Sequence, residues 1–92
     1  MIHFTLYSRS YCHLCDDMRA ALEKQLIDIP YQLTILDVDQ DPDLLALYDE
    51  LVPVLCARLS SDVTVSGAGQ QLCHYFLDGE KVNALIESTR NE

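Results

Sequence analysis

A chain of 92 residues has room for one hydrophobic core, so residues 1–92 are expected to form a single domain. Its formal net charge of -9 and predicted pI near 4.4 argue against nucleic acid and anionic membranes as partners. No apolar run approaches the ~20 residues that span a bilayer. The first residues lack the basic start and apolar core of a signal peptide. The sequence therefore predicts a cytoplasmic protein with mostly reduced thiols.

The N-terminal third of the chain predicts a strand followed by an amphipathic helix. Residues 2–8 alternate between apolar and polar side chains, which is typical of a strand. The period then lengthens, and apolar residues recur every four positions between about residue 11 and residue 26, as on the buried side of a helix. This stripe consists of Leu14, Met18, Leu22 and Leu26, with Cys15 and Ala21 near it.

Three further strands and two further helices complete the predicted order β-α-β-α-β-β-α. The strands are expected at residues 31–38, 52–59 and 71–77. The helices are expected after Asp41 and Asp78, because each aspartate can act as an N-cap. The opening strand-helix-strand unit implies parallel pairing through a right-handed crossover. Serine and glycine between residues 60 and 69 predict the loop of an antiparallel hairpin.

Cys12 and Cys15 form a C-x-x-C pair at the start of the first predicted helix. The free N–H groups and the dipole of a helix N-terminus stabilise a thiolate, and can lower the pKa of such a thiol from ~8.5 to roughly 3.5–7.5. The thiolate is the form that attacks a disulfide. Cys15 lies one helical turn further, within disulfide reach of Cys12. Arg9 and His13 could add positive charge near Cys12.

Other interpretations of the cysteines remain open from the sequence. A C-x-x-C is also half of a zinc site, whose other ligands would come from Cys56, Cys73, His74 or His3. The pair could also be two inert thiols. Cys56 and Cys73 fall within predicted neighbouring strands, so they are expected to be buried core residues, with a second redox pair as the alternative.

An acidic segment without a basic residue follows the second predicted strand. Its carboxylates are Asp37, Asp39, Asp41, Asp43, Asp49 and Glu50. Such a segment is expected to be a solvated face that keeps the protein soluble. The alternative is a docking surface for a basic partner.

A strand, a C-x-x-C at a helix start, and a Val-Pro before the third strand together resemble the thioredoxin superfamily. The closer resemblance is to small bacterial glutaredoxin-like proteins, and it is carried by "LYSRSYCHLC", "DVDQDPDLLALYDELVPVL" and "LCHYFLDGEKVNALIE". It implies a thioredoxin-like α/β fold, with a four-stranded mixed sheet in the order 2-1-3-4. The first and third helices would cover one face of the sheet, and the second helix the other.

The resemblance also implies roles for individual residues. Cys12 would be the nucleophile and Cys15 the resolving thiol of a thiol-disulfide oxidoreductase. Pro53 matches the cis-proline of the family, which would leave the backbone of Val52 free to pair with an extended peptide or with glutathione. The implied partner is a disulfide-containing protein or glutathione, the protein is expected to be a monomer, and no metal or cofactor is expected beyond the two cysteines.

The sequence departs from the family pattern at two places. His13-Leu14 separates the cysteines, instead of the Gly-Pro of typical thioredoxins or the Pro-Tyr of typical glutaredoxins. Asp78-Gly79 stands where glutaredoxins carry a Gly-Gly pair that helps to hold glutathione, and Arg9 is the candidate for their basic residue near the strand end. The competing function is a thioredoxin-fold binding module without turnover, with a partner peptide held beside Pro53.

Overall fold

The computed structural model describes residues 2–10, 12–59 and 69–90. Its strands are β1 (Ile2–Ser8), β2 (Tyr31–Asp37), β3 (Val54–Leu59) and β4 (Gln70–His74). Its helices are α1 (His13–Gln25), α2 (Pro42–Tyr48) and α3 (Gly79–Arg90), with a 3-10 turn at Val38–Gln40. The predicted order of elements is therefore confirmed. The predicted hairpin loop lies outside the described residues, apart from Gly69. In the part of the chain described, no helix is long and apolar enough to cross a membrane.

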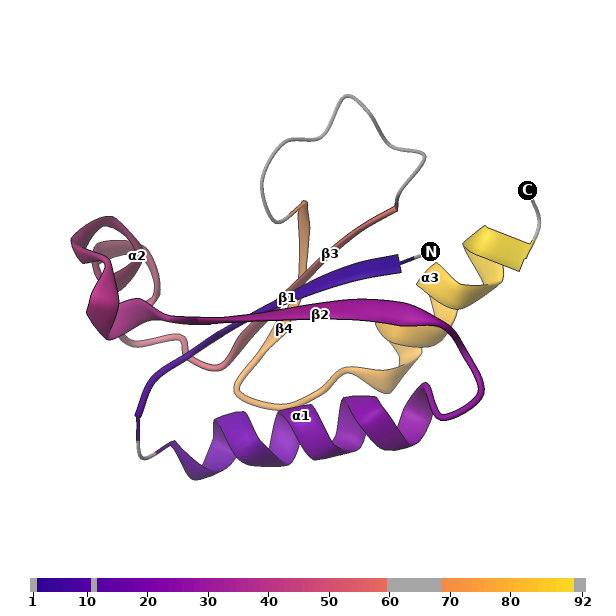
Figure 1. Cartoon of the computed structure of the whole chain (residues 1–92), viewed down its shortest axis with the longest axis horizontal. Coiled ribbons are helices and arrows are strands. Elements are labelled where there is room, and N and C mark those ends of the chain that lie inside the picture. Colours follow the sequence, from indigo (N-terminus) through magenta and orange to yellow (C-terminus); the bar gives the residue numbers. More distant parts are fainter. Residues whose placement is uncertain (1, 11, 60–68, 91–92) are drawn as a thin grey trace.

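The strands form one mixed sheet in the order β2-β1-β3-β4, as the resemblance implies (Figure 1). β1 pairs with β2 in parallel, and β3 runs antiparallel to both β1 and β4. The parallel pair is joined by α1, as a crossover connection requires. The fold is the thioredoxin-like α/β fold.

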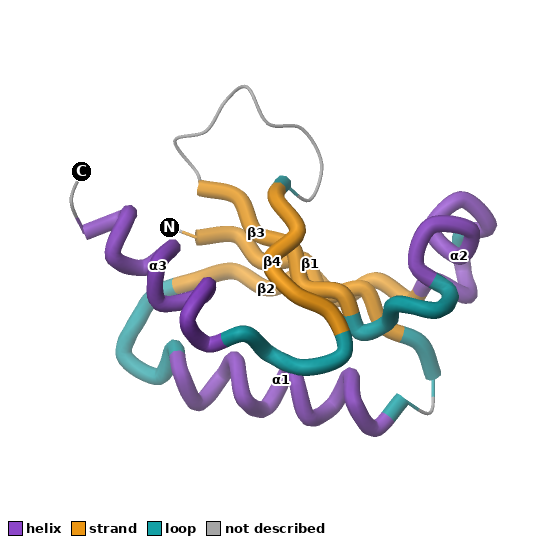
Figure 2. Tube along the Cα trace, turned by 180° about the vertical axis from the view of Figure 1, so that it is seen from behind, coloured by secondary structure: helices purple, strands orange, loops and turns teal. Residues whose placement is uncertain are grey.

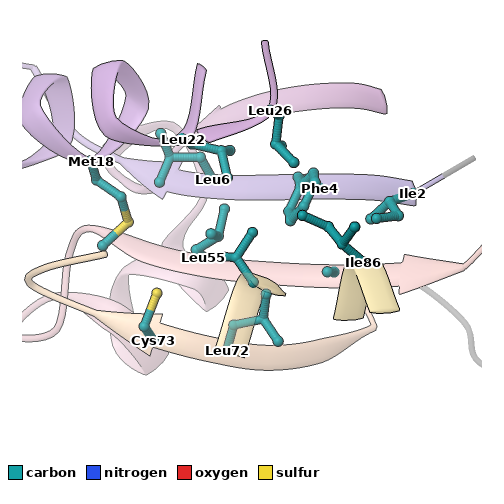
Figure 3. Packing of buried hydrophobic residues seen from close by; sticks show 12 residues of the cluster. Ile2, Phe4, Leu6, Met18, Leu22, Leu26, Leu55, Leu72, Cys73 and Ile86 are labelled. Atoms are coloured by element: carbon teal, nitrogen blue, oxygen red, sulfur yellow. The ribbon is translucent and has the colours of Figure 1, made fainter. Parts of the chain in front are cut away.

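α1 and α3 pack on the same face of the sheet (Figure 2), where they bury the larger core. Figure 3 shows this core, to which β1 contributes Phe4, α1 contributes Leu22 and α3 contributes Ile86. The two helices are also tied by a polar contact, because the side-chain Nε2 of Gln25 donates to the carbonyl of Gly79 at 3.0 Å. The start of α3 is thus fixed to the last turn of α1.

α2 covers one end of the opposite face of the sheet (Figure 1). There Tyr7 of β1 stacks on Tyr48 of α2, with ring centroids 4.6 Å apart, and a small core forms around them. The start of α2 agrees with the prediction, since the Asp41 carboxylate accepts hydrogen bonds from the N–H groups of Asp43 and Leu44. α2 lies beyond the carboxyl ends of β1 and β2, at the end of the sheet where α1 begins.

The predicted buried stripe of the first helix was wrong at its first member. Leu14 is 36% exposed, whereas Cys15 is only 4% exposed and takes the inward position. A helix has 3.6 residues per turn, so a four-residue spacing drifts by about 40° at each step. Over the run from Leu26 back to Leu14 this drift moves Leu14 to the edge of the stripe and places Cys15 near its centre.

Three of the predicted strands also need correction at their ends. β2 ends at Asp37, because Val38 opens the 3-10 turn. β3 begins at Val54 and not at residue 52, since Pro53 has no N–H to donate to a ladder. β4 runs from Gln70 to His74 and not from residue 71 to residue 77, and it ends early because the chain turns at Tyr75, which has a positive φ.

Candidate active site

Cys12 and Cys15 are joined by a disulfide at the first turn of α1, with their Cα atoms 5.2 Å apart. Cys12 is the N-cap of the helix, and its Sγ accepts a hydrogen bond from the N–H of Cys15 at 3.1 Å. Cys12 is partly exposed, whereas Cys15 is buried. The outer sulfur therefore lies at the positive end of the helix dipole and in reach of solvent, while the inner sulfur lies behind it.

The strand register gathers three segments at the disulfide end of the sheet. Tyr7, near the end of β1, pairs with Val54 at the start of β3, and Val54 pairs with His74 at the end of β4. The segment leading into α1, the loop between α2 and β3, and the turn after β4 therefore meet at one edge. The candidate site is built from these three connections.

The loop between α2 and β3 carries the residues that the sequence placed opposite the cysteines. The Val52–Pro53 peptide bond is cis, as the resemblance implies, and Pro53 is fully buried. Val52 differs from the expectation, because its N–H already donates to the carbonyl of Tyr48 at 3.1 Å. Among the hydrogen bonds of the described residues, the Val52 carbonyl oxygen has no donor. Of the Val52 backbone groups, only the carbonyl therefore remains to pair with an incoming peptide.

The turn after β4 is formed by Tyr75, which the sequence reasoning missed. Tyr75 has a φ of 64°, and the N–H of Phe76 donates to the carbonyl of His74 at 2.7 Å, so the chain makes a γ-turn. The hydroxyl of Tyr75 donates to the carbonyl of Glu50, and Phe76 is 70% exposed. No sequence signal marks this residue, since glycine and asparagine are the usual residues at positive φ.

Arg9 follows β1, but its guanidinium is bound to two carboxylates. Its Nη2 lies 2.8 Å from Asp39 Oδ1, and its Nη1 lies 2.8 Å from Asp49 Oδ1. The hydrogen bonds that Arg9 donates to Asp39, and then those to Asp49, raise the pKa of Arg9 above its usual range. The next residue, Ser10, donates from its hydroxyl to Asp37 at 3.5 Å. Part of the predicted acidic face is thus used to hold the segment that leads to Cys12.

His13 and Asp78 were also predicted to contact a substrate. His13 is the first residue of α1 and is exposed, next to Cys12. Asp78 instead caps α3, because its Oδ1 accepts from the N–H of Lys81 at 3.2 Å. The start of α3 is tied to Gln25 in the last turn of α1, and the backbone of Asp78 hydrogen-bonds to the Cys73 thiol; no contact of the described residues joins Asp78 to the disulfide. Contact of either residue with a substrate remains a prediction.

Cys56 and Cys73 are free and buried, as predicted. They belong to the two different cores, Cys56 to the one under α2 and Cys73 to the one under α1 and α3. Burial is the main cause that raises the pKa of both thiols. Within the described ranges, no group of three or more His, Cys, Asp and Glu side chains is arranged to hold a metal ion.

Residues 3–87 match the model of the glutaredoxin-like domain family, DUF836. The chain belongs to this family. Its fold is that of the thioredoxin superfamily, and its C-x-x-C pair stands at disulfide distance. A search of curated proteins finds no match to the chain.

Several solved structures are similar to this glutaredoxin-like domain. The solution NMR structure of protein Ne2328 from Nitrosomonas europaea is 32% identical, with a TM-score of 0.74, over 91% of this chain and 89% of that chain. An X-ray structure of a protein from X. campestris is 26% identical, with a TM-score of 0.61, over 92% and 96% of the two chains. Chloroplastic thioredoxin z is 15% identical with a TM-score of 0.66, over 100% of this chain and 80% of that one, and it shows the fold alone.

Proposed function

We propose that the protein is a thiol-disulfide oxidoreductase that uses Cys12 and Cys15 as its redox couple. The observation that supports this best is the hydrogen bond from the Cys15 N–H to the Cys12 Sγ at 3.1 Å. In the reduced protein the same N–H group would stabilise a thiolate on Cys12, because hydrogen bonding to the charged form favours that form. The thiolate is the attacking species in disulfide exchange.

The reaction proceeds in two balanced steps. The Cys12 thiolate attacks one sulfur of a substrate disulfide, which forms a mixed disulfide and releases the other substrate sulfur as a thiolate that takes up a proton. The Cys15 thiol then loses its proton and attacks Cys12 Sγ, which closes the Cys12–Cys15 bond and releases the second substrate thiol. Two electrons pass from the dithiol to the substrate, and a second dithiol protein, itself oxidised to a disulfide, restores the reduced form.

The substrate chain would lie along the edge formed by the three connections. The carbonyl of Val52 can accept one hydrogen bond from an extended substrate backbone. The exposed ring of Phe76 offers an apolar contact on the turn after β4. The buried position of Cys15 keeps the resolving sulfur away from the substrate until the mixed disulfide has formed.

Trapping tests the proposal with a defined substrate. Reduced Cys15→Ser protein is mixed with hydroxyethyl disulfide, and intact-mass and peptide analysis locate the adduct. We expect one mercaptoethanol adduct per chain, at Cys12, because the resolving thiol is absent. The matched control is Cys12→Ser, which leaves Cys15 in its buried position and should gain no adduct in the same time.

Turnover provides a second measurement. The wild-type protein should accelerate the reduction of insulin disulfides by dithiothreitol, and Cys12→Ser should not. A Cys12 that forms adducts no faster than the thiol of free glutathione, together with no effect on insulin, would contradict the proposal and favour the binding module without turnover.

A further inference from the structure

We infer that the redox site is selective for disulfides carried on cationic protein segments and disfavours glutathione, because Asp39 and Asp49 occupy the guanidinium of Arg9, three residues before Cys12. The inference rests on the proposed thiol-disulfide exchange at Cys12. It assigns Arg9, Asp39 and Asp49 to substrate selectivity.

All three nitrogen atoms of the Arg9 guanidinium are engaged. Its Nε and Nη2 lie 3.3 Å and 2.8 Å from the two carboxylate oxygens of Asp39, which is the two-point geometry of a strong arginine-carboxylate pair. Its Nη1 lies 2.8 Å from the carboxylate of Asp49 and 3.4 Å from the backbone carbonyl of the same residue. A carboxylate of glutathione would have to displace one of these partners to reach Arg9.

The other described cations are paired or lie away from the disulfide. Arg19 is bound to Glu23 further along α1, at 3.2 Å. Lys24 stands in the last turn of α1, and Lys81 stands in the first turn of α3, which is fixed to that same end of α1. Arg58 lies toward the far end of the sheet, next to His3. No hydrogen bond or ion pair of the described residues places any of these four side chains at the disulfide.

Carboxylates, in contrast, gather at the disulfide end. Asp16 and Asp17 follow Cys15 directly and are exposed. Asp37 contacts Ser10, and a chain step of two residues places the Cα atoms of Ser10 and Cys12 within ~7 Å of each other. With Asp39 and Asp49 these residues make five carboxylates, against the guanidinium of Arg9 and the exposed imidazole of His13. The site therefore repels an anionic disulfide and attracts a cationic one.

Exposed apolar groups at the same end favour a protein segment as the occupant. Leu14 lies between the two cysteines and is 36% exposed, and Phe76 on the turn after β4 is 70% exposed. Both side chains are available to contact an apolar side chain of a protein segment. The charge around them, within a chain of net charge -9, is complementary to a basic segment.

The first experiment compares three small disulfides that differ in charge. Reduced wild-type protein is mixed with glutathione disulfide, a dianion, with neutral hydroxyethyl disulfide, and with cystamine, a dication, and the rate of Cys12–Cys15 closure is followed. Each rate is divided by the rate of free dithiothreitol with the same disulfide, which removes the intrinsic reactivity of the substrate. In each case the dithiol is oxidised to a disulfide and the substrate is reduced to two thiols.

We expect a normalised cystamine rate roughly 10-fold or more above the normalised glutathione disulfide rate at low salt, because electrostatic steering changes association rates by this order. The ratio should approach one at about 1 M salt, where the Debye length falls to about 3 Å. A ratio near one at low salt, or one that favours glutathione disulfide, would overturn the inference. Exchange with the neutral hydroxyethyl disulfide would show that the proposed function still holds in that case. No exchange with any of the three would contradict the proposed function itself, and the inference with it.

Substitutions test the role of the Arg9 cluster. Asp39→Asn with Asp49→Asn frees Arg9, so the normalised ratio of cystamine to glutathione disulfide should fall by about threefold or more. Adding Arg9→Ala to this pair removes the freed cation, so the ratio should rise part of the way back to the wild-type value. The matched control is Glu23→Gln with Asp28→Asn, which removes the same charge near the other end of α1 and should change the ratio less. Equal changes in the two charge-removing pairs would show that overall charge, and not the occupied Arg9, sets the selectivity.

Discussion

The backbone N–H of Tyr75 donates a hydrogen bond to the carbonyl oxygen of Pro53 at 2.9 Å, so the turn after β4 holds the loop before β3. The hydroxyl of the same tyrosine donates to the carbonyl of Glu50, which fixes this loop at a second point. The φ of 64° at Tyr75 costs an L-residue ~1–3 kcal/mol, and the two hydrogen bonds offset part of this cost. One residue thus fixes the position of the loop that carries Val52.

Tyr75→Phe removes the contact with Glu50 and leaves the backbone contact with Pro53 in place. We expect the free energy of unfolding to fall by ~1 kcal/mol, the net value of one hydrogen bond, as measured by urea denaturation of the oxidised protein. The matched control is Tyr31→Phe, because the described contact of Tyr31 is a T-shaped contact between its ring and that of Phe4. Equal losses in the two variants would show that the hydroxyl of Tyr75 does not hold the loop.

The order of elements could be predicted because its signals are local. The N-cap at Asp41 satisfies the N–H groups of residues two and three positions on, and the same holds for Asp78 and the N–H of Lys81. The position of Cys12 at a helix start also followed from a local change in period, from alternation to a helical stripe. Such signals involve residues within one helical turn of each other, so they can be recognised in the sequence without knowledge of the folded structure.

The environment of the site could not be predicted, because it depends on distant partners. Arg9 meets Asp39 and Asp49, which lie 30 and 40 residues further along the chain. The sequence showed an acidic segment and a nearby cation, but not that folding pairs them. The positive φ of Tyr75 is likewise set by the loop it binds, and this tertiary contact ended β4 earlier than its apolar sequence indicated.

Leu22→Ala, within α1, should destabilise the protein more than Ile27→Ala, just beyond α1. Leu22 is 0% exposed and packs between α1 and the sheet, so its truncation leaves a cavity that costs ~2–5 kcal/mol. Ile27, just beyond α1, is 80% exposed, and Ile27→Ala should change the free energy of unfolding by less than ~0.5 kcal/mol. Chemical denaturation of both variants checks this difference, and a similar loss in both would contradict the described packing of α1.

The four thiols of the fully reduced protein should differ in their reactivity. Cys12 is partly exposed at the helix N-terminus, whereas Cys15, Cys56 and Cys73 are 4%, 3% and 9% exposed. Iodoacetamide at neutral pH should therefore modify one thiol per chain rapidly, and peptide mapping should place it at Cys12. In Cys12→Ala the rapid phase should be absent. Rapid labelling of Cys56 or Cys73 would mean that the two cores open more readily than the structure indicates.

Stability should fall in alkaline solution, because four buried or half-buried acids hold their protons more tightly in the folded chain. Burial is the largest cause that raises the pKa of Cys56 and Cys73 above 9.0, and that of Tyr7 and Tyr48 above 10.0. Well below pH 9 these groups are protonated in both the folded and the unfolded chain. As the pH rises through 9 and 10, the unfolded chain releases its protons first, so the free energy of unfolding decreases. Urea midpoints of the oxidised protein at about pH 8 and about pH 10.5 should show this decrease. Cys56→Ala removes one of the four groups, so this variant should lose less stability than the wild type over the same pH interval. Equal losses would mean that ionisation of the Cys56 thiol does not contribute to alkaline unfolding.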